Sequence, residues 1–170
     1  VFEIPGRQNY KPTDIEIEGD WSNAAFFFIG AAIRGNLSIS GLNPDSVQGD
    51  KKILEVIKAC GIDVKFEQGS YVLQNPPKLM PFEFDATDTP DLFPPLSVLA
   101  AYCNGTSAIK GVHRLQYKES NRAEAIMQEL RNMGIKVTTE KDDKMHIQGN
   151  QPQGAYSALT MTTGWQWQAL

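Results

Sequence analysis

The chain has 170 residues, a mass of 18.9 kDa and a net charge of -4, which is the size of one ordinary domain or two very small ones. Its apolar fraction of 41% and charged fraction of 21% are typical of a soluble globular protein and exclude disordered and collagen-like sequences. The slight acidic excess argues against broad nucleic-acid binding, and no apolar run reaches the roughly 20 residues that span a bilayer. We therefore expect no nucleic-acid partner and no membrane association, and the first residues do not resemble a signal peptide.

The cysteines and histidines of the chain do not form a recognisable metal-binding pattern. Cys60 and Cys103 lie far apart inside apolar segments, which indicates buried thiols in a reducing compartment and not a disulfide framework. His113 and His146 complete no known zinc-ligand spacing with them. The sequence thus predicts a cytoplasmic protein without a metal site.

Residues 15–74 alternate between strand and helix patterns. Apolar residues at every second position predict strands, and apolar residues spaced by three and four predict helices. In chain order these are a strand at 15–18, a buried helix at 24–33 with Ser22 as its N-cap, a strand at 37–40, a helix at about 50–59, and two strands at 62–66 and 71–73 joined by a turn. Residues 1–14 contain proline and glycine and no periodicity, so we interpret them as a connector.

The same order of elements recurs after a proline-rich link at 75–81. The predicted elements are a strand at 82–84, a helix at 92–102, a strand at 108–110, a helix from Ser120 or Asn121 to about 132, and strands at 135–137 and 145–147. Gly35 and Gly41 recur as Gly105 and Gly111 at one constant spacing. We therefore interpret the chain as an α/β (α+β) fold of two repeat units, 15–74 and 84–148, each ordered strand, helix, strand, helix, strand, strand.

Two segments carry side chains suited to chemistry. Asp91 follows Pro90 at a predicted helix start, where it is either a simple N-cap or a carboxylate able to act as a general base. Lys118, Glu119 and Arg122 lie at another helix start, where two cations and free backbone N–H groups would make an anion site. A solvated helix start with an internal ion pair is the alternative for this second segment. Neither segment alone establishes catalysis.

Together the two segments resemble the 5-enolpyruvylshikimate-3-phosphate synthases. The matching residues are D-T-P-D-L-F-P-P-L at 88–96, then R-L at 114–115 and K-E-S-N-R at 118–122, with G-D-W-S-N-A-A-F-F at 19–27 upstream. The resemblance covers about residues 15–148 and implies most of the C-terminal-side domain of such an enzyme. It also implies repeated βαβαββ units of the enolpyruvyl transferase type, two of which are present.

The resemblance implies a role for each matching residue. Asp91 would contact a hydroxyl of shikimate-3-phosphate and accept its proton, and Lys118 would hold the same substrate. Glu119 would move a proton at the methylene of phosphoenolpyruvate, which Arg122 would bind. The implied reaction transfers the enolpyruvyl group to the 5-hydroxyl of shikimate-3-phosphate and releases phosphate, with no cofactor or metal. Arg114 stands where some members have an asparagine, which leaves its role open.

The family's enzymes are much longer than this chain, and their substrates bind between two domains. Residues 1–14 would therefore be an interdomain connector, and we expect no useful turnover from this chain without its missing second domain. Two alternatives are a UDP-N-acetylglucosamine enolpyruvyl transferase and a non-catalytic anion-binding module that uses Lys118 and Arg122.

Residues 149–170 form an atypical tail that follows no strand or helix pattern. Codons for 159–169 can be chosen so that a reading frame two bases later encodes H-N-D-H-R-M-A-M-A, a run that the resembled family has at about this distance after its second unit. We interpret the tail as a frameshifted translation, with a cloning tail or a divergent segment as the alternative. In each case we expect the tail to be poorly ordered.

Overall fold

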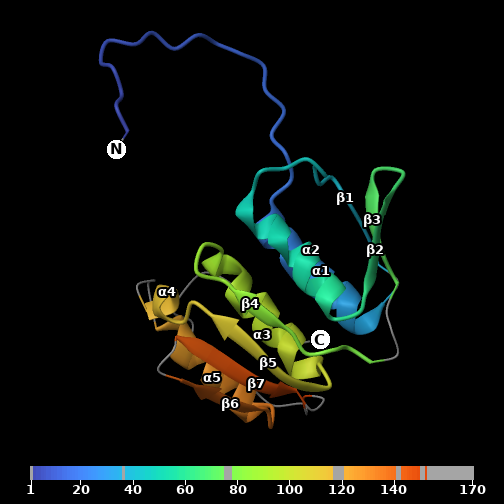
Figure 1. Ribbon diagram of the computed structural model, residues 1–170. Helices are drawn as coiled ribbons and strands as arrows, with labels where there is room; N and C mark the ends of the chain where they lie inside the picture. Colours follow the sequence, from blue (N-terminus) through green and yellow to red (C-terminus); the bar gives the residue numbers. More distant parts are fainter. Residues whose placement is uncertain are drawn as a thin grey trace.

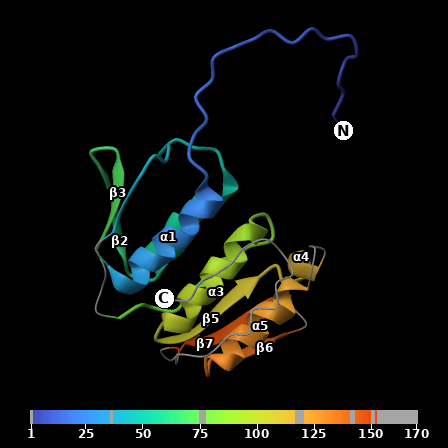
Figure 2. The ribbon, with the colours of Figure 1, turned by 180° about the vertical axis from the view of Figure 1, so that it is seen from behind.

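The computed structural model describes residues 2–35, 37–74, 78–116, 121–140, 143–149 and 152. Two mixed units of helix and strand pack against each other, and α1 (Trp21–Arg34) and α3 (Phe93–Tyr102) lie side by side between the two sheets (Figure 1). The view from behind shows the same arrangement, with the first residues of the chain extending away from both units (Figure 2). No helix within the described ranges is long and apolar enough to cross a membrane.

The first unit contains a three-stranded antiparallel sheet in the order β1-β3-β2. Its elements are α1, β1 (Ser38–Ser40), the 3-10 helix η1 (Gly49–Lys52), α2 (Ile53–Ala59), β2 (Asp63–Glu67) and β3 (Ser70–Gln74). The turn between β2 and β3 uses Gln68 and Gly69, both with positive φ, which suits the two-residue hairpin expected here. The predicted helices and the hairpin of this unit are confirmed.

The start of α1 differs from the prediction. Asp20, not Ser22, caps the helix, because its carboxylate accepts hydrogen bonds from the backbone N–H groups of Ser22 at 2.8 Å and Asn23 at 3.3 Å. The Ser22 hydroxyl instead donates to Asp50 at the start of η1. The cap is thereby moved two residues upstream, and the freed hydroxyl connects α1 to η1.

The predicted strand at 15–18 is wrong. Ile15 and Ile17 are 78% and 87% exposed, and no strand is assigned between residue 2 and β1 within the described part of the chain. Alternation of apolar and polar residues favours a strand only where a neighbouring edge supplies backbone partners and a core covers the apolar face. The segment finds neither, so the first unit has three strands and not four.

The second unit has the predicted order of strand, helix, strand, helix, strand, strand. Its elements are β4 (Glu83–Asp85), the 3-10 helix η2 (Pro90–Leu92), α3, β5 (Gly105–Lys110), α4 (His113–Gln116), α5 (Arg122–Asn132), β6 (Lys136–Thr139) and β7 (Lys144–Gly149). The sheet order is β4-β5-β7-β6, with β4 parallel to β5 and the other pairs antiparallel. The short helix α4 was not predicted, because four residues are too few to show a helical period.

The sheets confirm the internal repeat. β1-β3-β2 in the first unit corresponds to β5-β7-β6 in the second, and β4 has no counterpart among the described strands of the first sheet. Equal strand order in two consecutive segments of the chain is what a duplicated unit predicts.

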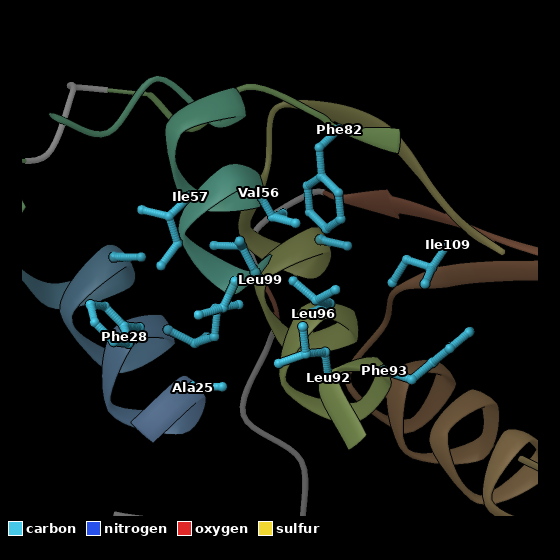
Figure 3. Packing of buried hydrophobic residues seen from close by; sticks show 14 of the residues in the cluster. Ala25, Phe28, Val56, Ile57, Phe82, Leu92, Phe93, Leu96, Leu99 and Ile109 are labelled. Carbon is cyan, nitrogen blue, oxygen red and sulfur yellow. The ribbon is translucent and has the colours of Figure 1, made fainter. Parts of the chain in front are cut away.

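One apolar core joins the units. Ala25 and Phe28 of α1 face Leu92, the last residue of η2, and Leu99 of α3, and Val56 of α2 approaches Phe82 (Figure 3). These side chains are at most 4% exposed, with the core continuing through Leu96 and Ile109 to the second sheet. The packing of α1 against α3 thus joins the two units through one shared core.

The predicted atypical tail lies almost entirely outside the described residues, which include only Gly149 and Pro152 of it. The proline-rich link is described from residue 78 onward.

Candidate functional site

Asp91 projects from a tightly bonded turn between β4 and α3. Thr89 N–H donates to the carbonyl of Ala86 at 3.1 Å, and Leu92 N–H donates to the carbonyl of Thr89 at 3.0 Å. Pro90 fixes the first residue of η2, where a missing N–H costs nothing. The backbone on both sides of Asp91 is therefore fixed, while its side chain remains 51% exposed.

The turn is anchored to the sheet through Asp85. Its carboxylate accepts hydrogen bonds from Lys110 Nζ at 2.8 Å and from the backbone N–H of Thr87 at 3.0 Å. The Lys110 bond, followed by the bonds from Thr87, holds the pKa of the Asp85 carboxyl far below its usual range. Gly111 packs next to this turn, since a Cβ there would lie 2.9 Å from the Thr87 nitrogen.

Arg122 at the start of α5 meets Asp91 of η2. The guanidinium Nη1 lies 3.5 Å from Asp91 Oδ1, and the two side chains are 25% and 51% exposed. Arg122 is the first residue of α5, and Asn121 caps the helix by accepting a hydrogen bond from Glu124 N–H at 3.3 Å. The structure thus brings together two predicted site residues that are 31 positions apart.

The remaining predicted site residues cannot be located in the same way. Lys118 and Glu119 lie outside the described residues. Arg114 is exposed on α4, the helix that immediately precedes them. The described part of the site therefore consists of one carboxylate and one guanidinium, both accessible to solvent.

The first unit supplies a neighbouring surface that sequence reasoning missed. A Cβ on Gly49 would lie 3.2 Å from Thr89 Cγ2, so η1 packs against the turn that carries Asp91. The helices α1 and α3 begin at the same end of the molecule (Figures 1 and 2). Helix N-termini carry partial positive charge. In the sequence, the S-V-Q-G-D run at 46–50, at the start of a predicted helix, was the feature that could have indicated this surface.

Gln48 holds this surface together. Its side-chain carbonyl accepts a hydrogen bond from Trp21 N–H at 3.0 Å, and its amide donates to Glu18 at 2.9 Å and to the Gly19 carbonyl at 3.0 Å. Ser46 Oγ also donates to Glu18, at 2.9 Å. The bonds from Gln48 and then from Ser46 lower the pKa of the Glu18 carboxyl.

The Glu18 contacts predict a pH-dependent stability. Because the pKa of Glu18 is lowered on folding, its contribution is complete above the ordinary glutamate pKa and is lost as the pH falls through the lowered value. Gln48→Met is expected to raise the Glu18 pKa toward its ordinary value and to flatten this acid dependence. An NMR titration of the Glu18 carboxyl carbon measures the shift, with Ser46→Ala expected to give a smaller one. An unchanged Glu18 titration in Gln48→Met would contradict this account.

Asp143 fixes the turn between β5 and α4. Its side chain accepts hydrogen bonds from the backbone N–H of His113 at 2.7 Å and contacts His113 Nδ1 at 2.5 Å. Its carbonyl accepts from Gly111 N–H at 3.0 Å. Asp143 has a φ of 67°, a left-handed conformation that aspartate tolerates better than most residues. Asp143, which directly precedes β7, thus holds the turn that leads into α4.

Asp143→Ala is expected to lower the free energy of unfolding by about 1–2 kcal/mol, because it removes the side-chain bonds and disfavours the left-handed backbone. Urea unfolding of the chain measures the loss. Asp143→Asn keeps an acceptor and should restore part of the stability, whereas Asp143→Gly separates the backbone contribution from the side-chain contribution. Equal stability of the wild type and Asp143→Ala would show that the observed bonds add nothing.

Comparison with known proteins identifies the family of the chain. The sequence pattern of the EPSP synthase (3-phosphoshikimate 1-carboxyvinyltransferase) family matches residues 1–163. The chain belongs to the EPSP synthase family. Among curated relatives, the 3-phosphoshikimate 1-carboxyvinyltransferase of Clostridium kluyveri is 38% identical over 150 residues, and that of Methanosarcina acetivorans is 39% identical over 158 residues. These alignments cover 88% and 91% of this chain but 35% and 36% of the relatives.

Solved structures show the same fold. An EPSP synthase from Acinetobacter baumannii superposes with a TM-score of 0.61 at 25% identity, covering 78% of this chain and 32% of that structure. The enolpyruvyl transferase NikO from Streptomyces tendae superposes with a TM-score of 0.59 at 18% identity and shares the fold, covering 82% of this chain and 32% of that structure. The expected fold class of repeated units is thereby confirmed, and the chain spans about a third of the length of these EPSP synthase relatives.

Proposed function

We propose that this chain forms part of an enzyme that transfers the enolpyruvyl group of phosphoenolpyruvate to the 5-hydroxyl of shikimate-3-phosphate and releases phosphate. The observation that carries the proposal is the meeting of Asp91 and Arg122, 3.5 Å apart, on an accessible rim of a chain that belongs to the EPSP synthase family. This reaction needs a base that accepts the hydroxyl proton and a nearby cation that binds an anionic substrate, and Asp91 and Arg122 are groups of these two kinds. The helix N-termini at the same end add positive potential for two anionic substrates.

The roles proposed here are those that the family resemblance implies, and the chemistry of the groups suits them. Asp91 takes the proton of the 5-hydroxyl of shikimate-3-phosphate, and the oxygen of that hydroxyl attacks the central carbon of phosphoenolpyruvate. The methylene of phosphoenolpyruvate gains a proton from Glu119. The tetrahedral intermediate then loses phosphate, and its methyl group returns the proton. Arg122 binds the carboxylate or phosphate of phosphoenolpyruvate, because a guanidinium can hold two oxygens at once. Lys118 holds the phosphate of shikimate-3-phosphate.

Shikimate-3-phosphate is favoured over UDP-N-acetylglucosamine as the acceptor. The curated relatives at 35–39% identity are named 3-phosphoshikimate 1-carboxyvinyltransferases. The K-E-S-N-R segment at 118–122, which follows R-L at 114–115, also favours the shikimate enzyme.

We also propose that residues 2–149 need a second domain for turnover. The chain spans about a third of its relatives, so groups that complete a site between two domains would come from elsewhere. The expected activity of the isolated chain is therefore negligible, although weak substrate binding at the Asp91–Arg122 rim is expected. A phosphate-release assay that gives near-normal rates for the isolated chain would overturn this part of the proposal.

Binding to the isolated chain can be tested by NMR. We expect shikimate-3-phosphate and phosphoenolpyruvate to shift the amide signals of residues 88–92 and 121–124, with weaker effects from inorganic phosphate. Arg122→Ala should weaken the response to phosphoenolpyruvate, and Asp91→Ala should weaken the response to shikimate-3-phosphate. Binding of both substrates and phosphate alike, unaffected by Asp91→Ala, would indicate an anion-binding module and no transferase site.

Turnover can be tested in a chimaera in which residues 2–149 replace the aligned segment of the Clostridium kluyveri relative. Phosphate release that depends on shikimate-3-phosphate and not on UDP-N-acetylglucosamine is expected. Circular dichroism and gel filtration establish that the chimaera is folded, and the unmodified relative serves as the active control. A folded chimaera that releases phosphate only with UDP-N-acetylglucosamine, or with neither acceptor, would contradict the proposed function.

The tail at 149–170 is proposed to be a frameshifted translation, because codons for 159–169 can be chosen so that a frame two bases later encodes H-N-D-H-R-M-A-M-A. Its consequence would be loss of the arginine in H-N-D-H-R-M-A-M-A, which would further weaken phosphoenolpyruvate binding. Sequencing the encoding DNA decides the matter, because the proposal requires a second frame that encodes this run.

A further inference from the structure

The two cysteines of the chain meet in the core between the repeat units. Cys60 follows α2 in the first unit, and Cys103 follows α3 in the second, 43 positions further along the chain. Their side chains are 0% and 1% exposed, and the sulfur atoms lie 4.0 Å apart. The sequence predicted two separate buried thiols, and only the packing of the units reveals that they are in contact.

Backbone hydrogen bonds fix the positions of both cysteines. Met80 N–H donates to the Cys60 carbonyl at 3.0 Å, and Asn104 N–H donates to the Leu79 carbonyl at 2.8 Å. The segment that connects the units is thus bonded to the chain at or next to each cysteine. The short distance between the sulfur atoms therefore follows from the main chain as well as from side-chain packing.

The contact makes the two thiols chemically unequal. Cys103 Sγ also lies 3.4 Å from the Leu99 carbonyl, to which it can donate a hydrogen bond. The hydrogen bond with Cys103, and then burial, raise the pKa of the Cys60 thiol, whereas the hydrogen bond from Cys60 lowers the pKa of Cys103. Cys103 is thus the first of the pair to become a thiolate, the form that reacts with oxidants.

We propose that Cys60 and Cys103 form an oxidative cross-link site, at which a small peroxide converts the two thiols into a disulfide between the repeat units. The Cys103 thiolate attacks one peroxide oxygen and becomes a sulfenic acid, while the other oxygen leaves as hydroxide and takes a proton to become water. The Cys60 sulfur then attacks the Cys103 sulfur, the S–O bond breaks, and a second water leaves. Two thiols are oxidised, and one peroxide is reduced to two waters.

The geometry requires only a local adjustment. A disulfide places the sulfur atoms about 2 Å apart, so the two sulfur atoms, which lie 4.0 Å apart in the structure, must approach each other by about 2 Å. Because both thiols are buried, peroxide reaches them only when the junction of the units opens locally. The cross-link therefore forms slowly in the folded chain, and it then restrains the junction until a reductant opens it.

The experiment uses the complete chain treated with hydrogen peroxide at native conditions. Free thiols are counted after denaturation, and peptide mapping by mass spectrometry locates the bond. We expect loss of both free thiols in a monomer, a peptide pair containing Cys60 and Cys103 that is two hydrogens lighter, recovery of both thiols with dithiothreitol, and a higher midpoint of thermal unfolding for the oxidised chain. This result does not depend on the proposed enzymatic function.

Cys60→Ala and Cys103→Ala are the matched controls, since each retains one thiol and cannot form the internal bond. Neither should gain thermal stability on oxidation. If a variant fails to fold, the peptide map of the wild type still decides the matter. Two free thiols in the folded wild type after a treatment that oxidises the urea-unfolded chain would overturn the proposal, as would disulfides found only between molecules.

Discussion

Replacing Asp91 with asparagine is expected to lower kcat of the active chimaera by about 10²–10⁴-fold, the usual contribution of a general base. The asparagine amide cannot accept the 5-hydroxyl proton. Its oxygen can still accept a hydrogen bond from Arg122 Nη1, which lies 3.5 Å from Asp91 Oδ1 in the wild type. The fold should therefore persist while the reaction slows. Phosphate release at saturating substrate measures the effect.

Asp88→Asn is the matched control for this prediction. Asp88 is exposed and lies three residues before Asp91 in the same turn, so it carries the same charge change without the contact to Arg122. Its variant should retain kcat within a small factor. Similar losses in both variants would indicate that general electrostatics of the turn, and not a base at Asp91, supports the reaction.

Phe28→Ala is expected to destabilise the chain by about 3–5 kcal/mol, a large part of the 5–15 kcal/mol that holds a typical domain folded. The Phe28 ring is completely buried, lies 5.9 Å from the Trp21 ring in a stacked pair, and meets the Tyr71 ring at 5.6 Å edge to face. Its removal leaves a cavity in the core that joins α1 to the first sheet. Urea unfolding followed by circular dichroism measures the loss, and partial unfolding at room temperature is an expected outcome.

Phe27→Ala tests whether the loss comes from burial. Phe27 precedes Phe28 on the same helix but is 62% exposed, so the same truncation should change the free energy of unfolding by less than about 0.5 kcal/mol. A comparable loss from both variants would mean that helix propensity, and not core packing, dominates at this helix.

Local sequence patterns were sufficient for most elements of the fold. Pro90 and Asp91 marked the start of a helix, Asn121 capped α5, and Gln68-Gly69 formed a hairpin turn, because each of these features is decided by backbone conformation and neighbouring residues. The constant spacing of glycines predicted the repeat, and the two sheets share their strand order accordingly. The family resemblance of the two charged segments was likewise readable from residue types alone.

Contacts between distant segments required the tertiary structure. The alternating residues at 15–18 have the composition of a strand, yet Ile15 and Ile17 remain exposed because no strand edge pairs with them. The hydrogen bonds of Gln48 to Glu18 and of Asp143 to His113 join residues about 30 positions apart, and no local period encodes such distances.

The sequence by itself determined the type and order of the elements, the internal repeat and the residues capable of acid–base and anion chemistry, since these depend on composition and short-range geometry. The packing of the two units decided that Cys60, at the end of α2, and Cys103, at the end of α3, lie with their sulfur atoms 4.0 Å apart. The approach of α5 to η2 placed Arg122 beside Asp91. Such proximities arise when two units bury their apolar helices against each other, and that burial depends on the whole core at once.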